Sequence, residues 1–379
     1  MMTWRHGVVR SLGRSWSGAQ ELTVQLLGGG AASSAAAAGD EVRALAYPDL
    51  VGMLSPGDRV LLNTTAQQRG LGTGGYALVV AQPDTLPVDP PPGPGHIVKA
   101  RYTPQQTMVL GVDEQESPYH ELLREADDLA GLPVVVADLH SALPAVVAGV
   151  RAEAATWGRQ LSVAYVMTDG GALPAAFSRA VAGLRQSGWL TATVTTGQCY
   201  GGDLESVTVH SGLLAAHLVA RADVVVLAQG PGNAGTGTRW GFSGVAAGEA
   251  LNAAAVLGGR PVASLRVSGT DRRERHYGVS HHSLTAIGRV ALAPADVVVP
   301  ELDGDLGARV RVQAAALGDR HRLVHLPTSG LQAALEASPV PLSTMGRSLA
   351  DDPAPFLAAA AAGVHAARLV LGDQRGQPA

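Results

Sequence analysis

The chain has 379 residues, of which 46% are hydrophobic and 16% charged, so it can bury a sizeable core and is long enough for two domains. A formal net charge of −4 and the lack of any Lys/Arg-rich run leave no basic surface for nucleic acid or an anionic membrane. The single cysteine, Cys199, excludes an intrachain disulfide. We expect a cytoplasmic protein, because no apolar signal core opens the sequence and the Ala-rich stretch near 358–371 is too short and too interrupted to span a bilayer.

Residues 1–95 predict a small β-barrel or β-sandwich domain. Short apolar or alternating runs separated by Gly, Pro and Asp turns indicate its strands, namely HGVVRSL, ELTVQLL, EVRALAYPDL, DRVLLNTTA and YALVVAQ. Within this domain, residues 28–40 (GGGAASSAAAAGD) form a low-complexity loop. Residues 87–96 (PVDPPPGPGH) mark the linker, because proline fixes φ and removes backbone donors.

Lys99 follows this linker and is the only lysine among the 28 Lys and Arg residues. An ammonium group is a compact charge that can lose its proton when buried, whereas a guanidinium cannot. We expect Lys99 to be a mostly exposed linker residue that contacts a ligand; an incidental surface position is the alternative.

Residues 96–379 predict an α/β domain with a mostly parallel sheet. Apolar runs alternate with stretches suited to crossover helices. The expected strands are LPVVVADLH, LSVAYVMTDG, LTATVTTGQ, ADVVVLAQG, RPVASLRVSG, ADVVVPEL and HRLVHLP. The expected helices are ALPAVVAGVRAEAATWG, PAAFSRAVAGLRQSG, SVTVHSGLLAAHLVARA and GVAAGEALNAAAVLGG.

Polar or titratable residues follow five of these strands. Open α/β sheets bind ligands outside the carboxyl ends of their strands. The residues are Asp138, His140 and Ser141; Thr168, Asp169 and Gly170; Thr195, Thr196, Gly197, Cys199 and Asp203; the loop GPGNAGTGT; and the stretch SGTDRRERHYGVSHHS. Five such ends favour one shared cleft over five separate turns. Asp169, Asp203 and His140 are candidates for proton transfer, and Cys199 is better explained as a buried inert thiol than as a nucleophile.

The loop after the fourth strand has the spacing G-x-G-x-x-G at Gly230, Gly232 and Gly235. Pro231 lies between the first two glycines, no helix opens until about residue 243, and no acidic residue follows at the usual distance, which argues against a dinucleotide site. The backbone N–H groups and the hydroxyls of Thr236 and Thr238 suit a phosphate or carboxylate. A tight structural turn is the alternative.

The stretch 268–283 supplies further candidates. Arg273 suits contact with an anion, Asp271 is a further candidate for ligand contact, and His276 suits acid/base chemistry. His281 and His282 could contact a ligand, but adjacent residues point in different directions on a helix, and no H-E-x-x-H motif or cysteine pair is present. We therefore expect no tightly bound metal. A solvated helix start capped by Ser280 is the remaining alternative.

The motifs LLNTTA, GHIVKARYTP, YVMTDGGALP, GQCYGGDLESV, GPGNAGTGT, RERHYGVSHHS and STMGRSL together resemble those of a bacterial, mainly Gram-positive, family of unknown function. The resemblance extends over nearly the whole chain and implies no activity or cofactor. The residues favour an enzyme that acts on a small anionic metabolite, phosphorylated or nucleotide-like, by hydrolysis or group transfer. A non-catalytic ligand-binding or regulatory module is the alternative, and the oligomeric state stays open.

Overall fold

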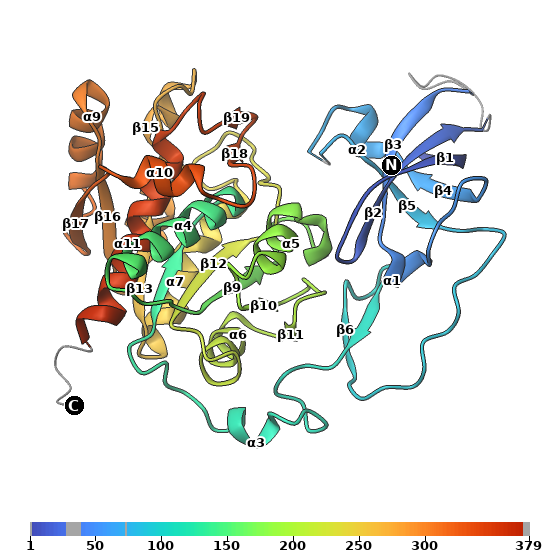
Figure 1. Ribbon diagram of the computed structural model, residues 1–379, viewed down its shortest axis with the longest axis horizontal. Coiled ribbons are helices and arrows are strands. Elements are labelled where there is room, and N and C mark those ends of the chain that lie inside the picture. The colour runs from blue at the N-terminus through green and yellow to red at the C-terminus, as the bar shows by residue number, and fades with distance from the viewer. Residues whose placement is uncertain (1, 28–38, 73, 374–379) are drawn as a thin grey trace. The chain divides into compact units, whose positions relative to one another are not determined.

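The computed structural model describes residues 2–27, 39–72 and 74–373 (Figure 1). The low-complexity loop expected at 28–40 lies almost wholly outside the described residues. The chain divides into two compact units, Met1–Pro94 with Ala100–Thr107, and Gly95–Lys99 with Met108–Ala379. A single boundary at residue 95 does not anticipate that Ala100–Thr107 belongs to the first unit.

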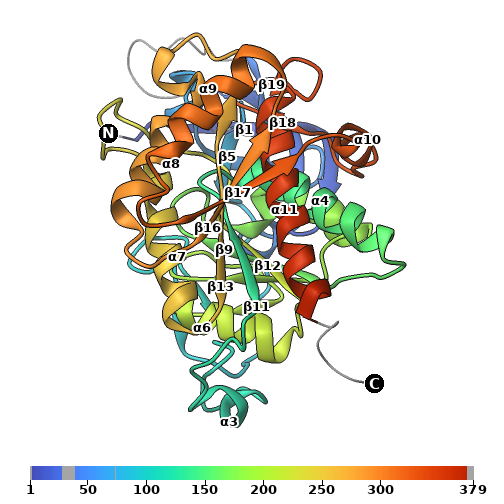
Figure 2. The ribbon, with the colours of Figure 1, turned by 90° about the vertical axis from the view of Figure 1, so that its left-hand side faces the viewer.

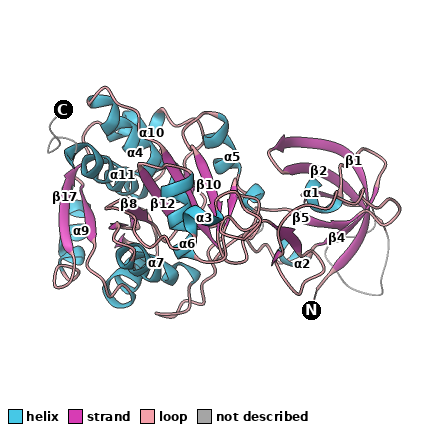
Figure 3. Ribbon diagram, turned by 90° about the horizontal axis from the view of Figure 1, so that it is seen from below, coloured by secondary structure: helices cyan, strands magenta, loops and turns pink. Residues whose placement is uncertain are grey.

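The first unit contains a closed five-stranded barrel of order β1-β2-β3-β5-β4, which confirms the expected β-barrel (Figure 3). Its strands are β1 (Trp4–Trp16), β2 (Ala19–Leu26), β3 (Glu41–Ala46), β4 (Arg59–Asn63) and β5 (Ala77–Ala81), with short helices α1 (Pro48–Val51) and α2 (Thr65–Gln68). Leu22, Val24 and Leu26 of β2 are buried, whereas the intervening Thr23 and Gln25 are half-buried. This alternation directs one face of the strand into the barrel core.

The second unit contains an eight-stranded sheet of order β11-β10-β9-β12-β8-β13-β16-β17. All neighbouring strands are parallel, which confirms the expected α/β fold class. The strands are β8 (Pro133–Val136), β9 (Val163–Thr168), β10 (Ala192–Thr195), β11 (Leu204–Glu205), β12 (Val224–Gln229), β13 (Arg260–Ser264), β16 (Asp296–Glu301) and β17 (Arg322–Pro327). Three small ladders pair β6 (Ile97–Lys99) with β7 (Thr107–Val109), β14 (Val267–Ser268) with β15 (Gly278–Val279), and β18 (Ser343–Thr344) with β19 (Arg347–Ser348).

Helices cover both faces of the sheet (Figure 2). One face packs against α4 (Leu143–Thr156), α5 (Arg179–Gln186), α10 (Leu331–Glu336) and α11 (Ala354–Asp373). The other packs against α6 (Val209–Leu214), α7 (Ala246–Val256), α8 (His281–Thr285) and α9 (Gly304–Ala315), while α3 (His120–Leu123) precedes the sheet in the chain. In β12, Val224 and Val226 belong to the first core, and Val225 and Leu227 to the second. A sheet buried on both faces explains the continuous apolar runs.

The apolar helix α11 packs tightly against α4. A Cβ atom on Gly149 would lie 2.0 Å from the backbone oxygen of Ala360, so only glycine allows this approach. The 19-residue segment Ala354–Gly372 is long and apolar enough to cross a bilayer, which corrects the expectation that this stretch is too short. However, 72% of the apolar window is buried, as in a core helix of the sheet.

Candidate functional site

Three adjacent strand ends bring Asp138, Gln229 and Arg266 together, because β8 lies between β12 and β13. Asp138 follows β8, Gln229 is the last residue of β12, and Arg266 lies between β13 and β14. The Gln229 side-chain amide donates to the backbone oxygen of Asp138 at 2.9 Å. Arg266 Nη1 lies 3.9 Å from Asp138 Oδ2. The sequence marks Asp138 only as a strand end and carries no signal for Gln229 and Arg266, because their proximity depends on the strand order.

A small cavity of about 30 Å³ with a mixed apolar and polar lining opens beside this group. That volume holds about two water molecules or an anionic group of similar size. Its polar side chains include Asp138, Ser141, Arg266, Ser268, Thr344 and Arg347. Two guanidinium groups in the lining are of the kind that bind a carboxylate or phosphate group. The Ser141 and Ser268 hydroxyls already donate to Thr344 and Asp352.

Asp138 differs from an ordinary surface carboxylate. Its side chain is 7% exposed, and burial raises its pKa above the usual range, although the nearby charge of Arg266 opposes the shift. A carboxyl group with a raised pKa keeps its proton to higher pH and can donate it.

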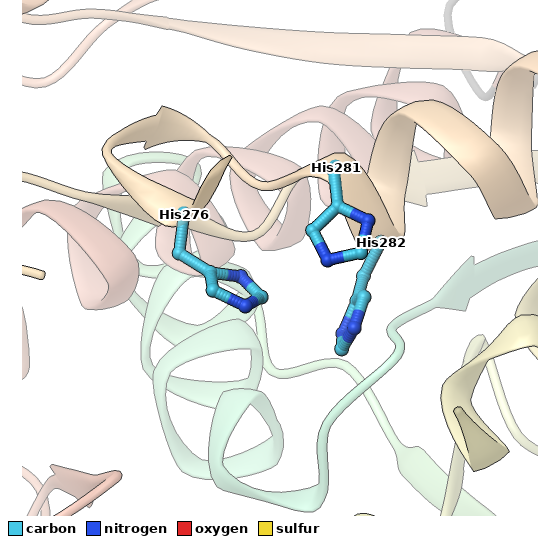
Figure 4. Close-up of side chains that lie close together, drawn as sticks. All are labelled: His276, His281 and His282. Carbon is cyan, nitrogen blue, oxygen red and sulfur yellow. The ribbon is translucent and has the colours of Figure 1, made fainter. Parts of the chain in front are cut away.

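Three imidazole rings lie close together (Figure 4). Arg266 contacts one of them, His282. His276 ends the short 3₁₀ turn Glu274–His276, and His281 and His282 open α8. One nitrogen from each ring lies within 4.8 Å of the other two. The expectation that His281 and His282 diverge is therefore wrong. Adjacent Cβ atoms on a helix do point apart, but rotation of the side chains brings the ring centroids to 4.4 Å.

Contacts on several sides hold these rings. His276 Nδ1 lies 2.8 Å from Ser280 Oγ, which also accepts from the backbone N–H of His282 as the cap of α8. The His282 ring stacks on Phe242, with centroids 3.8 Å apart and an interplanar angle of 0°. Arg266 Nη1 lies 3.2 Å from His282 Nδ1. Because guanidinium only donates, the imidazole nitrogen is the acceptor.

The three imidazoles are neutral at neutral pH. Burial, reinforced by the charge of Arg266, lowers the pKa of His276 to about 4 and that of His282 to about 3. Burial and nearby arginines also lower the pKa of His281. Neutral imidazoles accept hydrogen bonds and ligate metal ions, but they are poor proton donors.

The glycine-rich loop uses much of its hydrogen-bonding capacity on contacts with itself and with neighbouring segments of the protein. Gly230 donates its N–H to Thr168 at 3.0 Å, the Thr236 and Thr238 hydroxyls lie 3.1 Å apart, and Thr238 also accepts from the Gly241 N–H. Gly232 has a φ of 97°, and Gly235 forms an isolated β-bridge with Phe242. Arg275 donates to Gly237 at 3.0 Å. The loop is thus a closed turn that is hydrogen-bonded to the stretch 268–283. Its anion-binding role stays a prediction.

Arg273 is engaged within the protein. Its guanidinium makes two hydrogen bonds to Asp271, Nε to Oδ1 at 2.9 Å and Nη2 to Oδ2 at 2.8 Å. These bonds hold the pKa of Asp271 well below its usual range. Arg266 and Arg347 line the cavity, whereas Arg273 does not; Arg347 also lies 3.5 Å from Asp271 Oδ2.

Lys99 and Asp203 lie at the other side of the sheet, by β10 and β11. Lys99 is 0% exposed, which corrects the expected exposed position, and its Nζ lies 2.8 Å from Glu205 Oε2 and 3.0 Å from the Thr195 carbonyl oxygen. Asp203 pairs with Arg185 at 2.7 Å. Since β10 and β13 are four strand spacings apart, or about 19 Å, the five strand ends do not form one cleft.

Of the remaining candidates, Cys199 is buried, His140 is half-buried and Asp169 is exposed. His140 Nε2 lies 2.7 Å from Ser178 Oγ, its Nδ1 lies 3.0 Å from the Tyr165 hydroxyl, and burial lowers its pKa to about 4. Ser178 is only 3% exposed and caps α5, so this Ser–His pair is a buried structural contact. Cys199 is 0% exposed, and burial raises the pKa of its thiol. Asp169 accepts from the Gln198 N–H at 3.0 Å.

The chain belongs to the family described as "Protein of unknown function (DUF3866)", whose family model matches residues 43–363. This match confirms the resemblance found in the sequence motifs. No curated protein matches the chain. The family description names no activity, so a functional conclusion depends on the chemistry of the site.

Proposed function

We propose that the protein is an enzyme that acts on a small anionic substrate, such as a carboxylated or phosphorylated metabolite, by hydrolysis or group transfer. The reaction takes place at the carboxyl ends of β8, β12 and β13, in the region of Asp138, Arg266 and the three histidines.

One observation carries this proposal. Six buried side-chain atoms lack a hydrogen-bond partner among the described residues, and four of them belong to this region: Asp138 Oδ2, Gln229 Oε1, His281 Nε2 and Arg347 Nε. Of these, Arg347 Nε lies at ion-pair distance from Asp352 Oδ2, at 3.6 Å, so the observation rests mainly on the other three. An unpaired buried polar group costs about 1–3 kcal/mol. Their concentration near the carboxyl ends of neighbouring strands is typical of a site whose polar groups bind a ligand rather than stabilise the fold.

The charges in the cavity favour an anion. Arg266 and Arg347 both line it, and each side chain is largely buried, at 9% and 25% exposed. Asp271 and Asp352 lie 3.5 and 3.6 Å from Arg347 and offset part of its charge, so Arg266 supplies most of the attraction. A partly buried guanidinium interacts with an anion more strongly than an exposed one, because the effective dielectric constant is lower. The small volume suits the anionic group of the substrate, with the rest of the molecule outside.

Asp138 supplies the proton in this scheme. In hydrolysis, water oxygen bonds to the electrophilic carbon or phosphorus, and the bond to the leaving group breaks with its electron pair. The leaving group takes the Asp138 proton, and the proton that water loses then restores the carboxyl group. In group transfer, a second substrate replaces water as the attacking group.

A substrate panel tests this proposal. Thermal-shift measurements over small carboxylates and phosphorylated metabolites should reveal ligands that raise the melting temperature, and NMR of the same mixtures should detect turnover. Arg347→Gln should weaken binding of an identified anion by about ten- to a hundredfold, the range for losing a charge-assisted hydrogen bond. Asp138→Asn should abolish turnover while retaining binding.

Arg311→Ala is the matched control, since Arg311 is an exposed residue of α9. Binding that is equally strong in the Arg347 variant and in this control would overturn the assignment of the cavity. Binding without turnover of any bound anion would favour the ligand-binding module instead. A cytoplasmic location, where the lone cysteine stays reduced, fits the enzyme proposal.

A further inference from the structure

We infer that His276, His281 and His282 form a binding site for one divalent transition-metal ion of the zinc class. The inference rests on the proposed function only in that the ion would lie beside the proposed anion cavity. It is tested without any substrate.

The spacing of the rings fits such an ion. Because all three ligand nitrogens lie within 4.8 Å of one another, the smallest circle enclosing them has a radius of at most about 2.8 Å, against a zinc–nitrogen bond of about 2.0–2.1 Å. Movement of less than about 1 Å per ring therefore completes the coordination. Three histidines leave a fourth position open, as in catalytic zinc sites.

Two further features of the histidines suit metal binding. His281 Nε2 is buried and has no hydrogen-bond partner among the described residues. Its hydrogen-bonding capacity therefore does not stabilise the fold and is available to a ligand. His276 Nδ1 lies 2.8 Å from Ser280 Oγ, and a donated Nδ1–H would leave Nε2 of the same ring available as a ligand. Such a hydrogen bond on the second ring nitrogen is usual for metal-binding histidines.

Metal binding must break the hydrogen bond from Arg266 to His282 Nδ1. If the metal takes Nδ1, it occupies the lone pair that Arg266 uses. If it takes Nε2, the neutral ring carries its proton on Nδ1, which can no longer accept from Arg266. Either way Arg266 is released toward its other neighbours, Asp138 and the anion cavity. The ion and an anion therefore favour one another at this site.

Titration of metal-free protein with Zn²⁺ or Co²⁺ tests the inference. Competition with a zinc-chelating dye should give one ion per chain, and bound Co²⁺ should show the intense visible absorption of a four-coordinate site. His281→Ala should weaken binding by about 100-fold or more, since loss of even an outer-shell partner costs 10- to 100-fold. His281 is the primary target because it is less buried than His276 and His282. Arg266→Gln should tighten binding about tenfold, because the competing charge-assisted hydrogen bond disappears.

His325→Ala is the matched control, because His325 is exposed on β17. Circular dichroism should confirm that every variant is folded. Equal affinity in the His281 and His325 variants would overturn the metal site, as would the absence of stoichiometric binding to the folded wild-type protein. Neither result would affect anion binding that depends on Arg347. Conversely, stoichiometric metal with no anion binding would refute the proposed function and leave the metal site standing.

Discussion

Replacement of Lys99 by alanine should strongly destabilise the α/β unit. The ammonium group is completely buried, and its two oxygen partners, from Glu205 and Thr195, lie at 2.8 and 3.0 Å. The Glu205 carboxylate also accepts from the Thr195 hydroxyl at 2.7 Å and from the Gly201 N–H at 2.6 Å, so it stays buried when the lysine is removed. Breaking a buried ion pair from one side costs about 3–5 kcal/mol.

A second variant separates this effect from simple loss of packing. Lys99→Met combined with Glu205→Gln removes both charges, and its side chains fill similar volume while the amide keeps one acceptor oxygen. Replacing both partners of a buried pair is often close to neutral. The double variant should therefore recover most of the stability that Lys99→Ala loses.

Urea unfolding followed by far-ultraviolet circular dichroism measures the change, because all the longer described helices belong to the α/β unit. Arg124→Ala is the control. Arg124 pairs with Glu121, and both side chains are exposed, at 54% and 74%, so this change should cost less than about 1 kcal/mol. A Lys99→Ala protein as stable as the Arg124 variant would refute the argument from burial.

Three other properties follow from particular contacts. Gly149→Ala should destabilise the α4–α11 packing by about 1–3 kcal/mol in urea unfolding, because its Cβ would meet the Ala360 oxygen, whereas Gly72→Ala, with no neighbouring atom within 4 Å, should have little effect. Cys199, completely buried with a raised pKa, should react with a thiol reagent only after denaturation; rapid labelling of native protein would contradict this. Burial raises the pKa of Asp138 above the unfolded value of about 3.9. Its stabilising contribution is thus complete below about pH 4 and is lost as the pH rises through the folded-state pKa. Asp138→Asn should therefore make the free energy of unfolding less dependent on pH in this range. An unchanged pH dependence would show that the pKa of Asp138 is not raised in the folded protein.

The sheet could be predicted from the sequence because its strands are apolar runs bounded by turns. All seven expected strands of the α/β unit are present, including the weakest, HRLVHLP, which is β17. The strand β11 has only two residues, Leu204 and Glu205, and such a short segment carries no hydrophobic pattern. The order of the strands was also beyond prediction, because crossover helices of similar length can connect neighbouring or distant strands.

The strand order decides which polar residues meet, so the site was only partly predictable. The histidines at 276, 281 and 282 stood out by composition, and the structure brings them together. Arg266 and Arg347 looked like ordinary members of an arginine-rich chain, yet both line the cavity. The burial of Lys99 cannot be predicted from the proline-rich linker before it, because its partners lie about a hundred residues further along the chain.

Arg266 couples the binding of the anion to the binding of the metal ion. Its guanidinium lies 3.2 Å from His282 Nδ1, where its charge opposes a metal ion, and it also lines the cavity, where its charge attracts an anion. A bound anion that draws Arg266 away removes the obstacle to the metal, and a bound metal frees Arg266 for the anion. Linkage requires both effects to have the same size, typically 5- to 150-fold. We therefore expect a saturating anion to tighten Zn²⁺ binding by the same factor by which Zn²⁺ tightens anion binding, and Arg266→Gln to abolish both effects. Calorimetric titrations of each ligand with and without the other measure these factors. Independent binding of the two ligands in the wild-type protein would show that Arg266 does not connect the sites.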